Sequence, residues 1–268
     1  MTMRNPPPDG IDITRPNVAR IYDYLLGGKD NFAADREAAR QLIEAIPDVA
    51  AIARDNRSFL GRVVRYLATE ARIRQFLDLG SGLPTQANVH ELAQGVAPEA
   101  RMVYVDIDPV VASHGRALLA SGDQVGMVLG DLCDPASILQ HPDVTCRLDL
   151  SRPAAVLCTS TLHFIGDDAD PHKVIAEYRD HLAPGSYLAI SHGTLEEDPA
   201  GEGGKAEGVY RQASSQLHVR PIPEVLRFFD GFGLVDPGLT WITGWRPEPG
   251  TAPTGRPRSM RGGVGRKP

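Results

Sequence analysis

The sequence contains few cysteines, and their positions argue against two common uses of this residue. Cys133, Cys146 and Cys158 are the three cysteines among 268 residues, and no two of them form a Cys-x-x-Cys pair. Zinc sites typically use such pairs, and disulfide frameworks use an even number of cysteines at characteristic spacings. We therefore predict neither a metal site nor a disulfide framework.

Long apolar runs and an excess of basic residues are also missing. No stretch reaches the roughly 18 apolar residues of a membrane span, and residues 1–10 are rich in proline, unlike a signal peptide. We therefore expect a cytoplasmic protein with no membrane partner. The formal net charge of −6 provides no general attraction to nucleic-acid phosphates, so nucleic acid is not expected as a partner either.

The overall composition is typical of one folded α/β domain with loose ends. Apolar residues make up 42% of the chain and charged residues 23%, and this length can bury one large core. Residues 1–13 and 248–268 are rich in Pro, Gly or Arg without hydrophobic periodicity. We predict that both segments are flexible and lie outside the fold.

Residues 14–74 are predicted to form a helical N-terminal extension. Apolar residues follow the spacing i, i+3, i+4 and i+7 from residue 18 to residue 25, and Gly27-Gly28 provides a stop. A second helix is predicted at 33–46, ended by Pro47, and a third carries an apolar stripe from residue 49 to residue 67.

From residue 75 to residue 247, short apolar runs alternate with helical stretches, as in a parallel sheet covered by crossover helices. We predict five parallel strands, near residues 74–78, 102–106, 126–129, 154–159 and 186–191. Residues 195–215 are rich in glycine and acids, and we predict a loop there that could cover a site. A last helix is expected near 222–229, followed by two short strands within 234–245.

Carboxylates follow three of the predicted strands. Ligands of open parallel sheets bind outside the carboxyl ends of the strands. The candidates for binding at this edge are Asp78, Asp106, Asp108 and Asp131, together with the glycines at 80 and 82. Asp106, 24 residues after Gly82, is placed to accept hydrogen bonds from ribose hydroxyls, and Asp131 from an adenine amino group.

The turn after the first strand differs from that of a dinucleotide site. It runs Gly80-Ser81-Gly82-Leu83-Pro84-Thr85, so the third glycine of Gly-x-Gly-x-x-Gly is absent and Pro84 removes an amide that could bind a pyrophosphate. This favours S-adenosylmethionine, which has no phosphates, over NAD. A nicotinamide-dependent oxidoreductase is disfavoured for the same reason.

Three motifs resemble those of class I, Rossmann-like methyltransferases. They are Phe76-Leu77-Asp78-Leu79-Gly80-Ser81-Gly82, Val105-Asp106-Ile107-Asp108-Pro109 and Gly130-Asp131-Leu132. With Arg20-Ile21-Tyr22-Asp23-Tyr24-Leu25-Leu26-Gly27-Gly28-Lys29-Asp30-Asn31-Phe32 and Leu162-His163-Phe164, the chain resembles an actinobacterial family of S-adenosylmethionine-dependent methyltransferases, formerly a domain of unknown function.

The resemblance implies an α/β fold with a Rossmann-like sheet of about seven strands, helices on both faces and a helical N-terminal extension. Residues 75–247 would form the methyltransferase domain, and residues 14–74 its extension or lid. Asp78, Gly80 and Gly82 would hold the amino-acid part of the cofactor, Asp106 the ribose, and Asp131 with the Leu132 amide the adenine.

Two further groups of residues allow a functional and a structural interpretation. Tyr22 is a candidate catalytic residue and Tyr24, Lys29, Asp30 and Asn31 are candidate lid residues, but helix capping and packing would explain them equally. His163, just past the fourth strand, is a candidate general base or a histidine satisfied by its neighbours.

The sequence therefore predicts a methyltransferase that uses S-adenosylmethionine and acts on a small-molecule acceptor. In-line attack on a sulfonium methyl group needs alignment and exclusion of water more than catalytic side chains. The alternative is a regulatory protein that binds S-adenosylmethionine or S-adenosylhomocysteine without transferring the methyl group.

Overall fold

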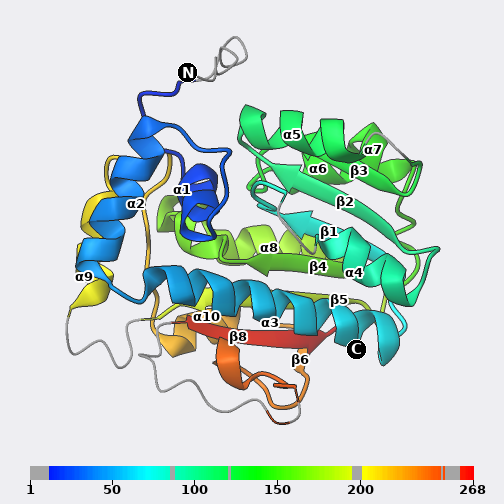
Figure 1. Cartoon of the computed structure of the whole chain (residues 1–268). Coiled ribbons are helices and arrows are strands. Elements are labelled where there is room, and N and C mark those ends of the chain that lie inside the picture. The colour runs from blue at the N-terminus through cyan, green and yellow to red at the C-terminus, as the bar shows by residue number, and fades with distance from the viewer. Residues whose placement is uncertain (1–11, 85–87, 120–121, 195–200, 249, 251–259) are drawn as a thin grey trace.

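The computed structural model describes residues 12–84, 88–119, 122–194, 201–248, 250 and 260–268, and these residues form an eight-stranded sheet (Figure 1). The strand order is β3-β2-β1-β4-β5-β8-β6, in which β6 is Gly233–Leu234 and β8 is Met260–Arg266, and β7 (Thr240–Trp241) also pairs with β8. The parallel strands are β1 (Gln75–Leu79), β2 (Arg101–Asp106), β3 (Val125–Leu129), β4 (Ala155–Thr159) and β5 (Tyr187–Gly193). This confirms the predicted α/β class.

The central strand β1 explains why the sheet is buried on both faces. All five of its side chains are buried, and it pairs in parallel with β2 on one side and β4 on the other. Such continuous burial requires helices above and below a parallel sheet. The strand order reverses between β1 and β4, so a crevice is expected at their carboxyl ends.

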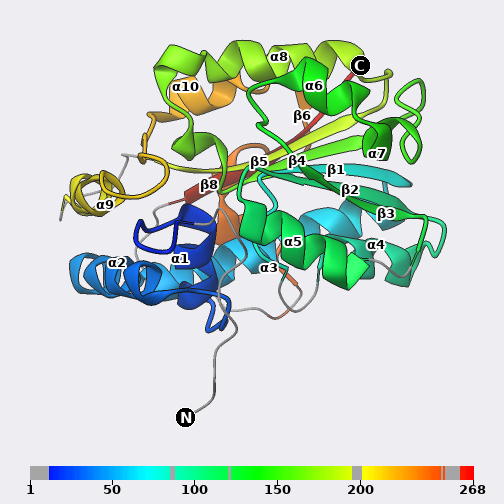
Figure 2. The same cartoon turned by 90° about the horizontal axis from the view of Figure 1, so that it is seen from above.

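Helices cover the two faces of the sheet, as Figure 2 shows from above. One face carries α3 (Val49–Thr69), α4 (Val89–Val96) and α5 (Pro109–Leu119), which share a core with the sheet. The other face carries α6 (Pro135–Gln140), α7 (Pro142–Thr145), α8 (Pro171–His181) and α10 (Ile222–Arg227). Because α3 packs on the sheet, only the first two helices of the predicted 14–74 extension lie apart from it.

Three helices form a cap beyond the carboxyl ends of the strands. The cap consists of α1 (Val18–Leu25), α2 (Ala33–Ala45) and α9 (Glu202–Tyr210), whose apolar side chains share a third core. The α9 segment falls within the predicted loop at 195–215, and that prediction was wrong for residues 202–210. Their three glycines disfavour an isolated helix, but Ala206 and Tyr210 are buried in the cap core and stabilise it. Residues 195–200 lie outside the described residues.

A buried ion pair joins the cap to the sheet. Arg20 of α1 lies 3.3 Å from the Asp35 carboxylate of α2 and 4.0 Å from that of Asp108 at the end of β2. Asp35 also accepts hydrogen bonds from the backbone N–H groups of Asn17 and Phe32, both at 2.8 Å. The Asp35 carboxylate therefore holds the first turns of α1 and α2 together, next to the strand ends.

The prediction of a flexible tail at 248–268 was wrong for its last residues. Residues 260–266 form β8 (Met260–Arg266), which runs antiparallel to β5 and separates it from β6 (Gly233–Leu234), while β7 (Thr240–Trp241) also pairs with β8. Glycine makes up much of β8 because helices and loops approach it closely on both faces. A Cβ at Gly262 would lie 2.7 Å from Phe59, and one at Gly265 would lie 2.8 Å from Phe232. Residues 1–11 and 251–259 of the predicted ends lie outside the described residues.

Three short 3-10 helices complete the described chain. They are η1 (Leu162–Phe164) and η2 (Asp167–Ala169), which follow β4, and η3 (Ile242–Gly244), which follows β7. Within the described residues no helix combines the length and the apolar character needed to cross a lipid bilayer.

Gly262→Ala tests the close packing of β8. The added Cβ would lie 2.7 Å from Phe59 Cζ and 2.9 Å from Ile242 Cγ2. We expect the free energy of unfolding to fall by about 1–3 kcal/mol, the usual range for overpacking in a core, as measured by urea denaturation. Gly95→Ala in α4 is the control, since no atom lies within 4 Å of its added Cβ; it should stabilise the protein by about 0.5–1 kcal/mol. A Gly262→Ala variant as stable as the unchanged protein would contradict the packing argument.

Candidate cofactor and active site

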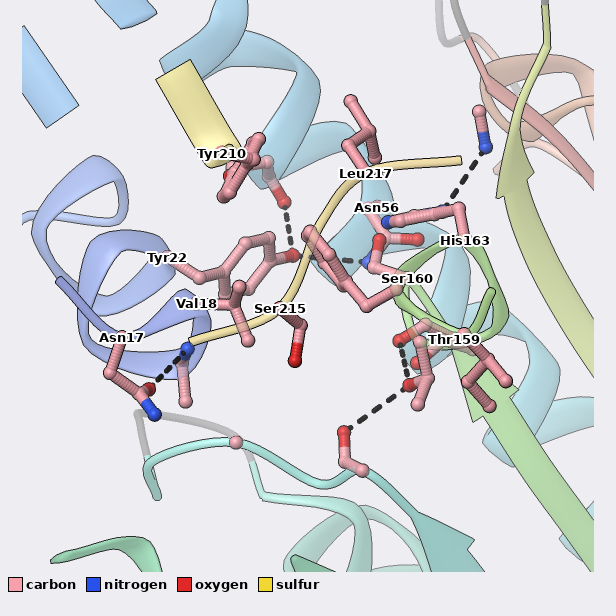
Figure 3. A pocket seen from close by; sticks show the side chains of 18 of the residues that line it. Asn17, Val18, Tyr22, Asn56, Thr159, Ser160, His163, Tyr210, Ser215 and Leu217 are labelled. Atoms are coloured by element: carbon pink, nitrogen blue, oxygen red, sulfur yellow. Dashed lines mark hydrogen bonds between the residues drawn. The ribbon is translucent and has the colours of Figure 1, made fainter. Parts of the chain in front are cut away.

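A cavity of about 500 Å³ lies between the cap and the carboxyl ends of the strands. Its sheet side is formed by the turn after β1 and by the ends of β2, β3 and β4, and its cap side by residues of α1, α2, α3 and α9 (Figure 3). This is the position expected for a ligand at a reversal of strand order.

The glycine turn forms one end of the cavity. Gly80 and Gly82 have φ angles of 73° and 68°, which only glycine adopts without strain. A Cβ at Gly80 would also overlap the Thr161 side chain after β4. The N–H groups of Gly80 and Ser81 donate to the Val105 carbonyl at 2.8 and 3.1 Å, so the turn is fixed to β2.

Asp106 is the carboxylate that holds this turn. It lines the cavity and is buried; Oδ2 accepts a hydrogen bond from Gly82 N at 2.8 Å, and Oδ1 accepts from Asp108 N at 2.9 Å. Burial raises the pKa of Asp106 to about 6, against the opposing effect of these hydrogen bonds. Each carboxylate oxygen can accept a further hydrogen bond, so Asp106 retains the capacity to bind two ribose hydroxyls.

Four of the predicted adenine and amino-acid contacts also lie at this cavity. Gly80, Gly82, Asp131 and Leu132 all line it. The Asp131 carboxylate accepts a hydrogen bond from Cys133 N at 2.8 Å, which fixes the loop after β3. These residues, with Asp106, form a continuous edge that can accommodate an adenosyl group.

Asp78 does not line this cavity. Asp78 and Phe76 lie on the same face of β1 because side chains alternate along a strand, and Phe76 belongs to the core beneath α3. Asp78 lines instead a small neighbouring cavity with Arg57 and Tyr104. Burial raises the pKa of Asp78 to about 7, although the Arg57 guanidinium opposes the rise.

Asp108, the other predicted cofactor residue, serves as a helix cap. Its Oδ1 accepts a hydrogen bond from Val110 N at 2.7 Å, in the first turn of α5, and its other oxygen faces Arg20. Asp108 does not line the cavity. Both oxygens of the Asp108 carboxylate therefore face protein groups, one in α5 and one in the cap.

The four predicted lid residues, Tyr24, Lys29, Asp30 and Asn31, do not line the cavity either. Lys29 and Asp30 are exposed, and Tyr24 packs against the cap core. Asp23 accepts hydrogen bonds from Asp30 N at 3.0 Å and Asn31 Nδ2 at 2.8 Å. Neither Asp30 nor Asn31 caps the next helix, because the N-cap of α2 is Phe32 and Asp35 completes its capping box. The cap reaches the cavity through Tyr22 and its neighbours on α1.

Tyr22 lines the cavity as part of a hydrogen-bonded chain of side chains. Its hydroxyl donates to the Ala53 carbonyl at 3.0 Å and accepts from Asn56 Nδ2 at 3.0 Å (Figure 3). The side-chain oxygen Oδ1 of Asn56 accepts a hydrogen bond from Ser191 Oγ at 2.6 Å, and Ser191 Oγ accepts one from Ser160 N at 2.9 Å. Burial raises the pKa of Tyr22, so its phenol stays protonated. This series of hydrogen bonds connects the cap through α3 to the ends of β4 and β5.

His163 also lines the cavity, and its surroundings define its protonation. Its Nδ1 accepts a hydrogen bond from Gly193 N at 3.3 Å, which assigns the ring proton to Nε2 (Figure 3). Burial, followed by the charges of His192 and Arg220, holds the pKa of His163 well below 6.5. The ring is therefore a neutral Nε2–H donor, and Nδ1 is occupied.

Several residues of the cavity were missed by sequence reasoning. Asn56 and Arg57 lie on α3, where only its apolar stripe was considered, and Arg57 lines both cavities. Two adjacent polar residues beside an apolar stripe were an available signal. Ser160, which follows β4 with a φ of 55°, and Tyr210 of α9 also line the cavity. Strained backbone often accompanies functional sites, but no sequence pattern indicated these two.

Asp78→Asn tests the buried carboxyl group beside the turn. The pKa of Asp78 is about 7 in the folded protein and 3.8 for a free carboxyl group, so ionisation of Asp78 opposes folding. The stability that the protonated carboxyl group contributes at low pH is therefore lost as the pH rises through 7. The Asp78→Asn variant has no carboxyl group to ionise, so it does not lose this stability as the pH rises. Between pH 5 and pH 8, we expect its free energy of unfolding to rise relative to the unchanged protein by about 1–3 kcal/mol, measured by urea denaturation. The exposed Asp123→Asn is the matched control, and a pH-independent difference for Asp78→Asn would contradict its raised pKa.

The comparisons with known proteins agree with this geometry. The family model described as S-adenosyl methyltransferase matches residues 4–268. A crystal structure of a protein from Thermobifida fusca, described provisionally as a methyltransferase, is 45% identical, with a TM-score of 0.93 over 98% of this chain and 99% of that chain. A DUF574 family protein from Streptomyces avermitilis is 41% identical, with a TM-score of 0.92 over 96% of this chain and 99% of the other.

A more distant structure shares the fold alone. An N,N-8-amino-8-demethyl-D-riboflavin dimethyltransferase from Streptomyces davawensis is 18% identical, with a TM-score of 0.50 over 93% of this chain and 62% of that chain. No curated protein sequence matches this chain. The match over almost the whole length and the cavity at the Rossmann-like switch point lead to one conclusion: the chain belongs to the S-adenosyl methyltransferase family, whose cofactor is S-adenosylmethionine.

Proposed function

We propose that this protein transfers the methyl group of S-adenosylmethionine to a small-molecule acceptor bound under the cap. The observation that carries the proposal is the position of Asp106, a buried carboxylate that holds the glycine turn and lines the cavity with acceptor capacity to spare. When bound, S-adenosylmethionine supplies a methyl group on a positively charged sulfonium sulfur.

In this proposal, the sheet side of the cavity binds the cofactor. Asp106 accepts from the ribose hydroxyls, and Asp131 with the Leu132 amide contacts the adenine. The backbone at Gly80 and Gly82 leaves room for the amino-acid part. Asp78 and Asp108 act indirectly, because one lies in the neighbouring cavity and the other caps α5.

The cap side of the cavity aligns the acceptor and excludes water. Tyr22 is a positioning residue, since both hydrogen-bonding directions of its hydroxyl are occupied by α3. His163 offers a neutral N–H group rather than a free lone pair, so we assign it a binding role instead of that of a general base. Nothing observed favours the alternative of a regulator without transferase activity.

Asp106→Asn tests the cofactor site. Replacing the carboxylate weakens hydrogen bonds to a charged acceptor, each worth about 1.5–3 kcal/mol. We therefore expect the Kd of S-adenosylhomocysteine to rise about 10- to 100-fold, measured by calorimetry on the full chain. Asp123→Asn should bind as the unchanged protein does, and NAD should not bind. If S-adenosylhomocysteine binds none of the folded proteins, the proposal fails.

The pH dependence of binding provides an independent test of Asp106. Its pKa of about 6 means that it is ionised at pH 7.5 and largely protonated at pH 5. Protonation turns one acceptor oxygen into a donor. If only the ionised form binds, the apparent Kd of S-adenosylhomocysteine should be about tenfold higher at pH 5 than at pH 7.5. The Asp106→Asn variant should show a flat profile over this range, and an equally steep profile in the variant would assign the titration to another group.

A further inference from the structure

The cavity extends from the strand ends into the cap, and this cap half is predominantly apolar. Its walls come from α1, α2, α3, α9 and the segments after α2, β4 and α9, and they include Leu25, Leu42, Ile46, Phe164, Tyr210 and Leu217. Burial of apolar surface is the main favourable contribution available to a ligand in such a pocket.

Two aromatic side chains form a wall of this half. The rings of Phe164 and Tyr210 lie 5.0 Å apart at an interplanar angle of 65°, an edge-to-face arrangement that fixes both. Aromatic rings pair preferentially with further rings in offset or edge-to-face contacts. A flat aromatic ligand fits this wall better than a flexible aliphatic chain, which would lose more conformational freedom on binding.

None of the six apolar and aromatic wall residues named above carries a charge, and the charged side chains of the described cavity come from other positions. Asp106 and Asp131 follow β2 and β3, and Arg57 of α3 also lines the small cavity at the glycine turn. Asp168, on η2 after β4, is exposed to solvent. In the cap half, the phenols of Tyr22 and Tyr210 have pKa values raised by burial, and they remain neutral. An ionised ligand group there would lose its hydration and gain no ion pair from these neutral side chains.

His163 supplies a polar contact to this half. Since Nδ1 accepts from Gly193 N, the Nε2–H group is the ring's remaining hydrogen-bonding group, and it is a donor. The ring is fixed by edge contacts with Phe164 at 4.6 Å and His192 at 5.3 Å between centroids. A buried donor needs an acceptor, and a carbonyl or hydroxyl oxygen of a ligand is one.

We propose that the cap half binds an uncharged aromatic acceptor molecule, with its ring against Phe164 and Tyr210 and an oxygen atom that accepts a hydrogen bond from His163 Nε2–H. This proposal rests on the methyltransferase function proposed above, because it identifies this half of the cavity as the acceptor site. It concerns binding and assigns the class of molecule by charge, shape and hydrogen-bonding capacity.

The test uses three ligands that share one ring system and differ in charge. Calorimetry on the full chain, saturated with S-adenosylhomocysteine at pH 7, compares 2-naphthol, which is neutral, with the 2-naphthoate anion and the 2-naphthylmethylammonium cation. We expect 2-naphthol to bind at least tenfold more tightly than either ion. Equal or tighter binding of an ion would overturn the proposal.

Two pairs of variants locate the binding. Leu217→Glu places a charge in the cap half and should weaken 2-naphthol binding at least tenfold, whereas Leu226→Glu, at a 38% exposed position on α10, should have no effect. His163→Leu removes the donor and should weaken binding at least fivefold. His163→Gln should restore most of the loss, because an amide can accept from Gly193 N and still donate.

The outcomes separate this proposal from the function on which it rests. Unchanged 2-naphthol binding in Leu217→Glu or in His163→Leu overturns the proposed site or its donor. S-adenosylhomocysteine binding is measured first on every variant, and it should stay unchanged in Leu217→Glu. If S-adenosylhomocysteine does not bind the unchanged protein, the proposed methyltransferase function fails, whether or not 2-naphthol binds.

Discussion

The hydrogen bond from Gly82 N to the buried Asp106 carboxylate is the interaction on which the cavity depends. It joins the turn after β1 to the end of β2, and the same carboxylate accepts from Asp108 N, which starts the segment leading to α5. A buried carboxylate is stable only when it is well hydrogen-bonded. The group that shapes the turn is therefore also the group that we propose binds the ribose.

The cap is positioned by a second set of buried charges at the same place. Arg20 connects α1 to Asp35 of α2 and to Asp108 beyond β2, while the Tyr22, Asn56 and Ser191 side chains connect α1 through α3 to β5. The cofactor half and the cap half of the cavity are thus held together by polar contacts. The cap half, where the proposed acceptor lies, is predominantly apolar.

Some elements of the sheet and the cap can be predicted from the sequence, and others cannot. The parallel strands β1 to β5 are predictable because both faces of each are buried, which produces apolar runs, and α1 to α3 because their apolar residues recur at helical spacing. In contrast, α9 and β8 are rich in glycine and carry little pattern of their own. Each is stabilised by partners distant in sequence: α9 by α2, and β8 by β5, Phe59 and Phe232.

The sequence by itself determined the α/β class, the family, and the strand-end positions of Gly80, Gly82, Asp106 and Asp131, because these depend on local periodicity and on short motifs. Only the tertiary structure decided which neighbouring carboxylates line the main cavity. Asp78 and Asp108 lie in the same motifs as Gly80 and Asp106, which line the cavity, but strand alternation turns Asp78 toward Arg57, and helix capping turns Asp108 toward Val110. The lining of the cap half also required the structure, because α1, α2, α3 and α9 contribute to it from distant parts of the chain, and only packing brings them together.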